Sequence, residues 1–138
     1  MTTPLIKAAL ITAYRDCART NTTKYDAVPF DPPSSEPWAR VKVSPVSITT
    51  ASQGVGGLDL HQGLLQITVS DVPDLGDGRI GRALEAFRTA FPAGRQLTYG
   101  TQKVLIDGGD ISPLFSADGW IRASISIRWR AYTTRQEV

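Results

Sequence analysis

The sequence predicts an α+β fold: a mostly antiparallel β-sheet with two helices packed on one face. Apolar residues recur with a helical period near the N-terminus and again in the middle of the chain, and they alternate with polar residues in the other segments. The order helix, strands, helix, strands favours antiparallel pairing. Since 138 residues is a usual length for one domain, we expect residues 1–138 to fold as a single unit.

The first predicted helix begins near the N-terminus, where Thr3 can cap it and Pro4 suits its first turn. Its apolar stripe consists of Ile6, Ala9, Leu10, Ala13, Tyr14 and Cys17. Because Cys17 lies in this stripe, we interpret it as a small buried hydrophobe rather than a reactive thiol. The second predicted helix ends before Pro92 and Gly94. Its stripe consists of Ile80, Ala83, Leu84, Phe87, Ala90 and Phe91.

The first two strands are predicted from the alternation of polar and apolar residues. One covers residues 38–43, with Ala39 on the apolar side, and we expect Pro45 to end it. The next covers residues 58–69. Its apolar phase changes at Gly63, which suggests a β-bulge there.

The last strand is the clearest element of the sequence. Short strands at 97–99 and 103–106 precede it. Its apolar residues alternate without a break against polar ones, which indicates one buried and one polar face. They are Ile121, Ala123, Ile125, Ile127, Trp129 and Ala131.

Three segments are predicted to lie outside helices and strands. Residues 20–37 are polar and rich in proline, which indicates an ordered loop. Residues 47–57 are small, uncharged and rich in glycine, which indicates a flexible loop. Residues 133–138 are expected to be a frayed tail.

The composition argues against an enzyme. A single cysteine and a single histidine cannot build a disulfide or a His-rich zinc site, so we expect no metal and no cofactor. A nucleophile-and-base mechanism would depend on His61, which we place on the surface or a sheet edge with no pattern supplying its partners. No apolar run reaches the length of a membrane span and no signal peptide is recognisable, so we expect synthesis in a cytoplasm.

Residues 76–81 match the G-x-G-x-x-G pattern of dinucleotide-binding proteins. We expect no cofactor there, because Asp71, Asp74 and Asp77 would place negative charge beside a pyrophosphate. An N-cap at Asp77 explains the same residues without a ligand.

Charge placement is the remaining functional signal, since a net charge of +2 is small for a dedicated DNA-binding domain. The predicted polar strand faces carry the cations Arg40, Lys42, Arg122, Arg128 and Arg130. The predicted turns carry the acids Asp71, Asp74, Asp77, Asp107, Asp110 and Asp118. Opposite charges at two places on one protomer suit head-to-tail association into a closed ring. An ordinary solvated face and contact with nucleic-acid phosphates stay open as alternatives.

Several strings, taken in order, resemble the tail terminator (tail-completion) family of bacteriophages with long, non-contractile tails. The N-terminal strings are VPFDPP at 28–33 and PWARV at 37–41, a loop followed by a strand. The remaining strings are GLLQITV at 63–69, AFPAG at 90–94, LTYG at 97–100, DGWI at 118–121 and ISIRW at 125–129. The resemblance covers nearly the whole chain.

The resemblance implies a virion structural protein: a ring, usually a hexamer, that caps the head-proximal end of the tail tube and stops its polymerisation. The implied partners are other copies of the chain, the major tail tube protein and the head–tail connector, with transient passage of DNA and no membrane. We expect the cations Arg40, Lys42, Arg122, Arg128 and Arg130 and the acids Asp71, Asp74 and Asp77 to lie at protomer contacts. The expected tube-docking loop, which would become ordered on contact, is Ile48, Thr49, Thr50, Ala51, Ser52, Gln53, Gly54, Val55, Gly56 and Gly57.

Two other functions remain open from the sequence. A head–tail connector or another minor tail protein would also be a small α+β domain in a ring. A nucleic-acid-binding accessory protein would bind with an affinity that falls steeply as salt rises.

Overall fold

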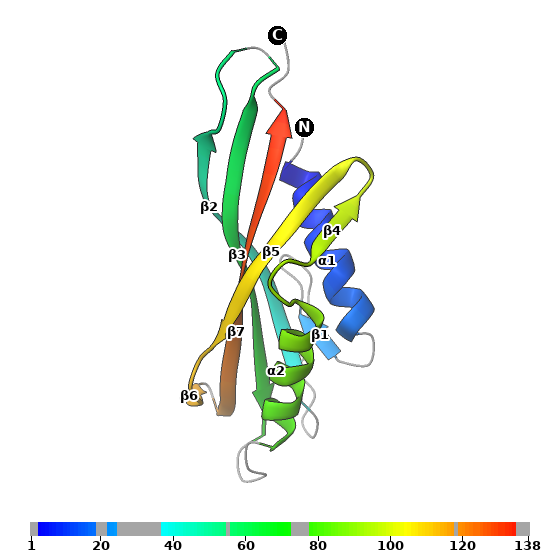
Figure 1. Ribbon diagram of the computed structural model, residues 1–138. Coiled ribbons are helices and arrows are strands. Elements are labelled where there is room, and N and C mark those ends of the chain that lie inside the picture. Colours follow the sequence, from blue (N-terminus) through cyan, green and yellow to red (C-terminus); the bar gives the residue numbers. More distant parts are fainter. Residues whose placement is uncertain are drawn as a thin grey trace.

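The structure, a computed structural model, describes residues 3–18, 22–24, 37–54, 56–72, 78–117 and 119–134. The elements of this part of the chain follow the predicted order, in which each of two helices is followed by several strands (Figure 1). The elements are α1 (Thr3–Ala18), β1 (Thr22–Lys24), β2 (Trp38–Thr50), β3 (Leu58–Asp71), α2 (Gly78–Ala90), β4 (Gln96–Tyr99), β5 (Gln102–Ile111), β6 (Phe115–Ala117) and β7 (Trp120–Thr134).

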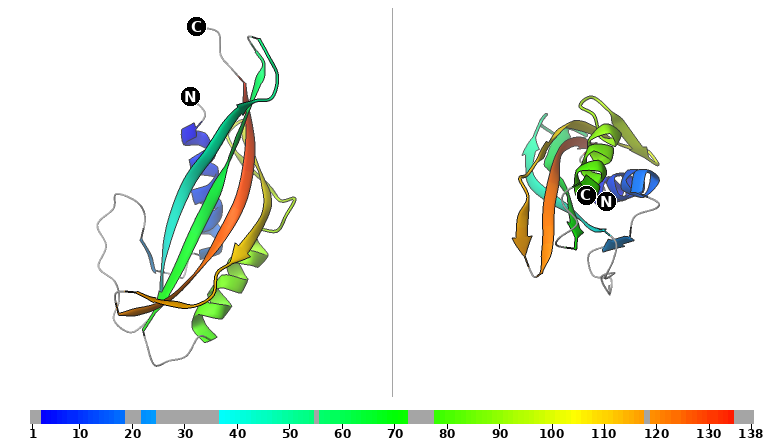
Figure 2. Two further views of the ribbon diagram at one scale, coloured as in Figure 1. Left: turned by 90° about the vertical axis from the view of Figure 1, so that its left-hand side faces the viewer. Right: turned by 90° about the horizontal axis from the view of Figure 1, so that it is seen from below.

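The strands within these ranges form one sheet in the order β1-β2-β3-β7-β5-β4, and β6 pairs with the first residues of β7. The prediction of a mostly antiparallel sheet is confirmed, because only the short β1 runs parallel to its neighbour β2. β7 lies in the middle of the sheet although it comes last of the strands. It pairs along its whole length with β3, and β5 covers part of its other edge (Figure 2).

The sheet has two chemically different faces. One face, here called the core face, carries the odd-numbered residues of β3 and β7 and is buried over most of its length. The other, called the outer face, carries the even-numbered residues of these strands and their partners in β2. Its polar members include Arg40, Lys42, Gln66, Thr68, Ser124, Ser126, Arg128 and Arg130. The predicted alternation along the last strand is confirmed by the burial pattern of β7.

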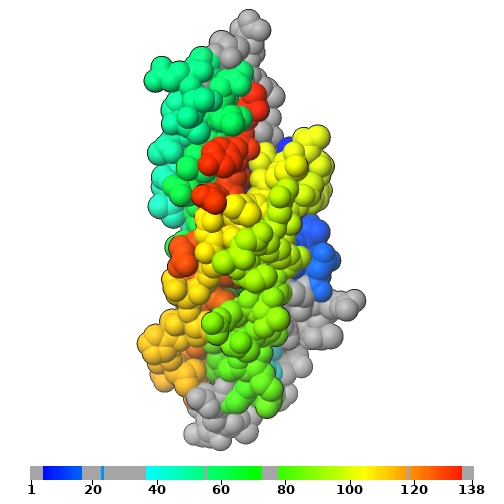
Figure 3. All heavy atoms as spheres, viewed as in Figure 1, coloured from blue at the N-terminus to red at the C-terminus, as the bar shows by residue number. Residues whose placement is uncertain are grey.

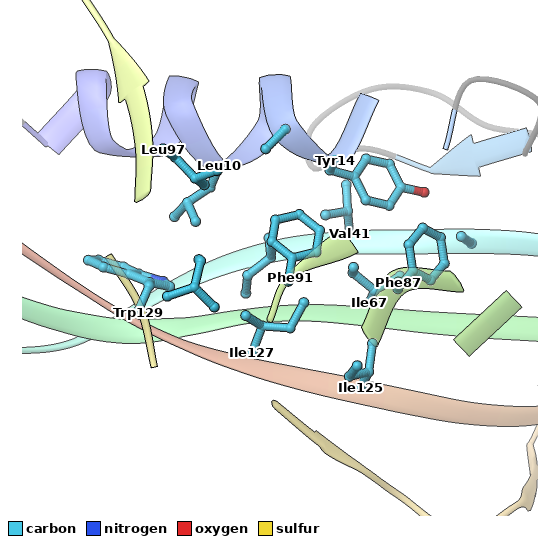
Figure 4. Close-up of a cluster of buried hydrophobic side chains, with 14 of the residues drawn as sticks. Leu10, Tyr14, Val41, Ile67, Phe87, Phe91, Leu97, Ile125, Ile127 and Trp129 are labelled. Carbon is cyan, nitrogen blue, oxygen red and sulfur yellow. The ribbon is translucent and has the colours of Figure 1, made fainter. Parts of the chain in front are cut away.

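Both helices contribute to the same hydrophobic core as the core face of the sheet (Figure 4). The ring of Tyr14 in α1 stacks on Phe87 in α2 with centroids 5.5 Å apart. The Tyr14 hydroxyl is also 2.6 Å from Thr23 Oγ1, which ties β1 to α1. The buried apolar helix residues are Ile6, Ala9, Leu10, Ala13 and Tyr14 in α1 and Ile80, Leu84 and Phe87 in α2. No helix in the described ranges is long and apolar enough to cross a membrane.

β2 is longer than the sequence predicted. Pro45 does not end it, because the strand passes through a bulge where the register shifts between Pro45 and Ser47. β1 pairs only with the first residues of β2, so the outer edge of β2 has no described strand beside Pro45, and a proline without an N–H is tolerated there. The bulge was predicted at Gly63 in β3. The structure places it in β2 instead, where Pro45 pairs with Gly63 and Val46 is the extra residue.

Gly63 is required by a close approach between strands. A Cβ at this position would lie 2.5 Å from the Ser44 carbonyl oxygen and 2.6 Å from the indole ring of Trp129. Real Cβ atoms do not come so close to other heavy atoms, so any side chain would force the ring or the strand to move. The Trp129 ring therefore packs directly on the β3 backbone.

Several predicted boundaries differ from the observed ones. β1 lies inside the segment predicted as a proline-rich loop, whose residues 25–36 lie outside the described ranges. The loop predicted from residue 47 starts only after Thr50, because β2 continues to that residue. Thr133 and Thr134 belong to β7 rather than to a frayed tail, and Thr133 is buried.

Asp107 and Asp110 lie within β5, not in a turn as expected from the neighbouring glycines. The register between β5 and β7 shifts between Ile106 and Gly108, and Gly108 has a φ of 122°. A glycine is favoured at this bulge because few other residues adopt a positive φ. The prediction for Asp118 lies outside the described residues.

Candidate interaction surfaces

His61 is buried on the core face rather than exposed at a surface or edge, which corrects the sequence-based expectation. Its Nε2 lies 2.8 Å from Oγ1 of Thr133 in β7. This hydrogen bond satisfies a buried polar group and explains why the histidine is tolerated in the sheet. Among the described residues, no group of three or more His, Cys, Asp or Glu side chains could hold a metal ion.

The cations of β7 are neutralised in part by acids of the adjacent strand. Arg128 donates through Nη1 to Oδ2 of Asp110, and the Arg130 Nε atom lies 3.4 Å from Oδ1 of Asp107. Both acids are in β5, which pairs directly with β7. The two arginines predicted to form a basic patch therefore belong to mixed charge pairs on the outer face.

Arg122 belongs to an aromatic cluster at the β6 end of the outer face. Its guanidinium lies 5.6 Å from the ring centroid of Trp38, a cation–π contact. Trp38 meets Trp120 edge to face, with centroids 5.6 Å apart and ring planes at 84°. The cluster joins the beginnings of β2 and β7. Within it, Trp38 is buried by its neighbours although it does not belong to the main core.

Arg40 and Lys42 form a different kind of site. They are exposed, they lie two residues apart on one side of β2, and their cross-strand partners in β3 are Thr68 and Gln66. These four side chains line a depression of about 160 Å³. Within the described ranges, neither cation forms an ion pair.

Asp71 does not lie at a surface contact, which corrects its predicted role. It is fully buried, and Arg79 in α2 binds its carboxylate through two hydrogen bonds, Nε to Oδ2 at 3.0 Å and Nη2 to Oδ1 at 2.7 Å. The Val72 backbone N–H donates a third bond to the carboxylate, at 2.8 Å. Asp71 therefore fixes α2 against the end of β3. The predicted contact residues Asp74 and Asp77 lie outside the described residues.

The β2–β3 hairpin forms one end of the elongated molecule (Figures 1 and 3). Its turn is closed by bonds from the Ala51 and Ser52 N–H groups to the Leu58 carbonyl, and the Leu58 N–H donates to Ser52 Oγ at 2.7 Å. Two large apolar side chains just before the turn are strongly exposed, Val46 by 69% and Ile48 by 60%. Of the predicted docking loop, Val55 alone lies outside the described residues.

A second exposed apolar group lies toward the opposite end of the molecule, where β5 runs into β6 (Figure 1). Ile111, Leu114 and Phe115 are each exposed by more than two fifths. The sequence analysis missed this group. Its signal was available, because three large apolar residues fall within five positions around Pro113 without helical or strand periodicity.

A family model described as "Phage tail terminator protein" matches residues 5–129 of the chain. The chain belongs to the phage tail terminator family. Membership assigns a structural role in a phage tail and confirms the family suggested by the sequence strings. The family is one of structural proteins rather than enzymes, and it indicates the tail of the virion as the place where the chain acts.

The fold is shared with a solved structure at a TM-score of 0.78, with 19% sequence identity over 95% of this chain and 96% of that chain. At this level of identity the likeness shows the fold alone. No curated protein is significantly similar to this family member in sequence.

Proposed function

We propose that this chain forms a ring, most simply a hexamer, that caps the head-proximal end of the tail tube. The ring ends polymerisation of the tube and joins the tail to the head connector. Its partners are then other copies of the chain, the major tail tube protein and the connector, and assembly takes place in the host cytoplasm. Family membership supports this role.

The observation that carries the proposal is the exposed apolar hairpin end. The exposure of Val46 and Ile48 favours a contact with a partner, because burying each side chain gains about 1.5–3 kcal/mol. A hairpin projecting from the sheet also offers backbone and side chains to a neighbouring cylinder. We assign the hairpin, residues 46–58, to the contact with the tail tube, and the β5–β6 corner at the opposite end to the connector side.

We assign the contact between neighbouring protomers of the ring to the outer face of the sheet. In this proposal both helices pack on the core face and leave the outer face free for the neighbouring protomer. The outer-face cations Arg40, Lys42, Arg122, Arg128 and Arg130 lie along that contact. Asp74 and Asp77 stay candidates for its acidic side, and Asp71 is removed from it because of its burial.

The hairpin assignment is tested by the double substitution Val46→Ser/Ile48→Ser and by deletion of residues 51–56. Both side chains are exposed, so the melting temperature should change by less than about 2 °C. Tails made with either variant should grow beyond the normal length or fail to join heads. Electron microscopy of tails from infected cells measures both outcomes.

The matched control is Tyr99→Ser, which removes another exposed large apolar side chain, at the β4–β5 turn that β7 separates from the hairpin in the sheet. Tails made with it should have normal length. Normal tails from the hairpin variants would exclude the hairpin from tube docking, and assembled rings with a number of copies other than six by native mass spectrometry would reject the hexamer.

A further inference from the structure

We infer that the Arg40–Lys42 depression is a receptor for one carboxylate, supplied by a second copy of this chain. The inference rests on the proposed ring and specifies the chemistry of one of its contacts. The ligand of these two outer-face cations would be an acidic side chain, and the neighbouring protomer would supply it.

The geometry of the depression fits a single small anion. The direct cross-strand pairs Arg40–Thr68 and Lys42–Gln66 place a guanidinium, an ammonium, a hydroxyl and a carboxamide around one hollow of about 160 Å³. All four groups can donate hydrogen bonds, and two of them carry positive charge. A carboxylate accepts such donors with both oxygens, and the guanidinium can bind it through two parallel bonds.

Arg40 and Lys42 differ from three arginines of the molecule that are paired with acids. Arg79, Arg128 and Arg130 each bind an aspartate of their own chain. In the described part of the chain, Arg40 and Lys42 do not, although they lie on the same sheet face as Arg128 and Arg130. Two adjacent exposed cations repel each other, so an anion from outside the chain would relieve that repulsion.

The local character of the charge favours a carboxylate over nucleic-acid phosphates. A phosphate backbone needs a stripe of cations that spans several charges. Here the cations farther along the outer face are already paired with Asp107 and Asp110, and a cation–π contact engages Arg122. What is left is a single point of positive charge, which suits one acidic side chain in a protein interface.

Among the acids that the structure describes, Asp16 best fits as the ligand. Among the described acids, it is exposed and makes no ion pair with its own chain. It lies on α1, whose buried side packs into the core with the core face of the sheet. Asp16 and the depression thus lie on opposite sides of one protomer, so they can meet only between copies. Contacts between two different surfaces of identical chains are the kind that close a ring.

The experiment combines charge reversal with cross-linking. Rings are assembled, alone or on tail tubes, from an equal mixture of unlabelled and ¹⁵N-labelled full-length chain, and a carbodiimide then joins amines to carboxylates in direct contact. Mass spectrometry should find Lys42 of one isotope joined to Asp16 of the other. The variant Arg40→Glu/Lys42→Glu should need at least a tenfold higher concentration for half-maximal ring assembly, and adding Asp16→Lys should restore most of the loss.

The control variant Arg82→Glu/Arg88→Glu changes the net charge by the same amount at two exposed cations of α2, outside the depression and the outer face, and it should assemble within twofold of the wild-type concentration. Rings of Arg40→Glu/Lys42→Glu that form at the wild-type concentration would overturn the inference but leave the proposed function intact. The absence of rings in the wild-type chain, alone and on tubes, would overturn both.

Two further outcomes decide the identity of the anion. If Arg40→Glu/Lys42→Glu lost a salt-sensitive binding to duplex DNA while ring assembly was unchanged, the ligand of the depression would be a phosphate rather than a carboxylate. Cross-links from Lys42 to another acid of a second copy would reject Asp16, and cross-links only to a different tail protein would reject the second copy.

Discussion

The two faces of the same strands behave differently. On the core face of β3 and β7, the side chains pack in a continuous hydrophobic cluster with both helices. The outer face of these strands carries serine, threonine, glutamine and arginine side chains beside a few large apolar ones, and two arginines of β7 form ion pairs with β5. Burial of apolar area stabilises the fold far more than exposed charge pairs do. The core face therefore contributes most of the stability of the fold, and substitutions on the outer face should cost little of it.

The largest expected effect separates these two roles on neighbouring residues of β7. Ile127 is fully buried on the core face, so Ile127→Ala should lower the free energy of unfolding by about 3.5 kcal/mol through lost burial and a cavity. Ser126, one position earlier, lies on the outer face, so Ser126→Ala should change it by less than about 0.5 kcal/mol. Urea unfolding curves measure both values. Similar losses from the two variants would contradict the division into faces.

A smaller loss is expected from adding volume rather than removing it. Gly63→Ala would press a methyl group against the Trp129 ring and the Ser44 carbonyl, and we expect a loss of about 2 kcal/mol. The control is Gly81→Ala in α2, where a new Cβ meets no atom within 4 Å and alanine favours the helix by up to about 1 kcal/mol. Thermal unfolding should move in opposite directions for the two variants. A stable Gly63→Ala protein would show that the strand can move away from the ring.

The smallest effects compare two ion pairs of the chain. Asp71 is buried and held by two hydrogen bonds from Arg79, so a double-mutant cycle with alanine should give a coupling of about 1.5 kcal/mol. Asp110 and Arg128 are both well exposed, so their coupling should stay below about 0.5 kcal/mol. Repeating both cycles in 0.5 M salt should weaken only the exposed pair. Equal couplings would mean that burial does not set the strength of these pairs.

Much of the fold could be predicted because it depends on local periodicity. The stripes at Ile6–Tyr14 and Ile80–Phe87 predicted both helices, and the alternation from Ile121 to Ala131 predicted the face of β7 that is buried. The three-residue strands β1 and β6 are too short to show a period. Pro45 was misinterpreted because it lies at a bulge, on an edge of β2 beside which the described residues place no strand, and this removes the usual penalty for proline in a strand.

The interaction surface was less predictable, because its charges are set by pairing between distant segments. Asp107 and Asp110 enclose two glycines in the sequence, which locally indicates a turn. Only the pairing of β5 with β7 shows that these aspartates face Arg130 and Arg128. The partner of His61 is Thr133, 72 residues away in the sequence. Asp71 was interpreted as a turn residue because its partner Arg79 lies in a different element, α2, and local sequence does not show how α2 packs against β3.

The position of β7 in the sheet also affects how the protein is made. The strand between β3 and β5 is supplied by residues 120–134, so the β1–β3 and β4–β5 parts of a growing chain cannot be joined into one sheet until these residues have been made. Closing the sheet is a late, long-range step, which slows folding but makes it all-or-none. Nascent chains and prematurely terminated fragments therefore lack a finished protomer surface. Such fragments cannot occupy a place in a virion that requires an intact subunit.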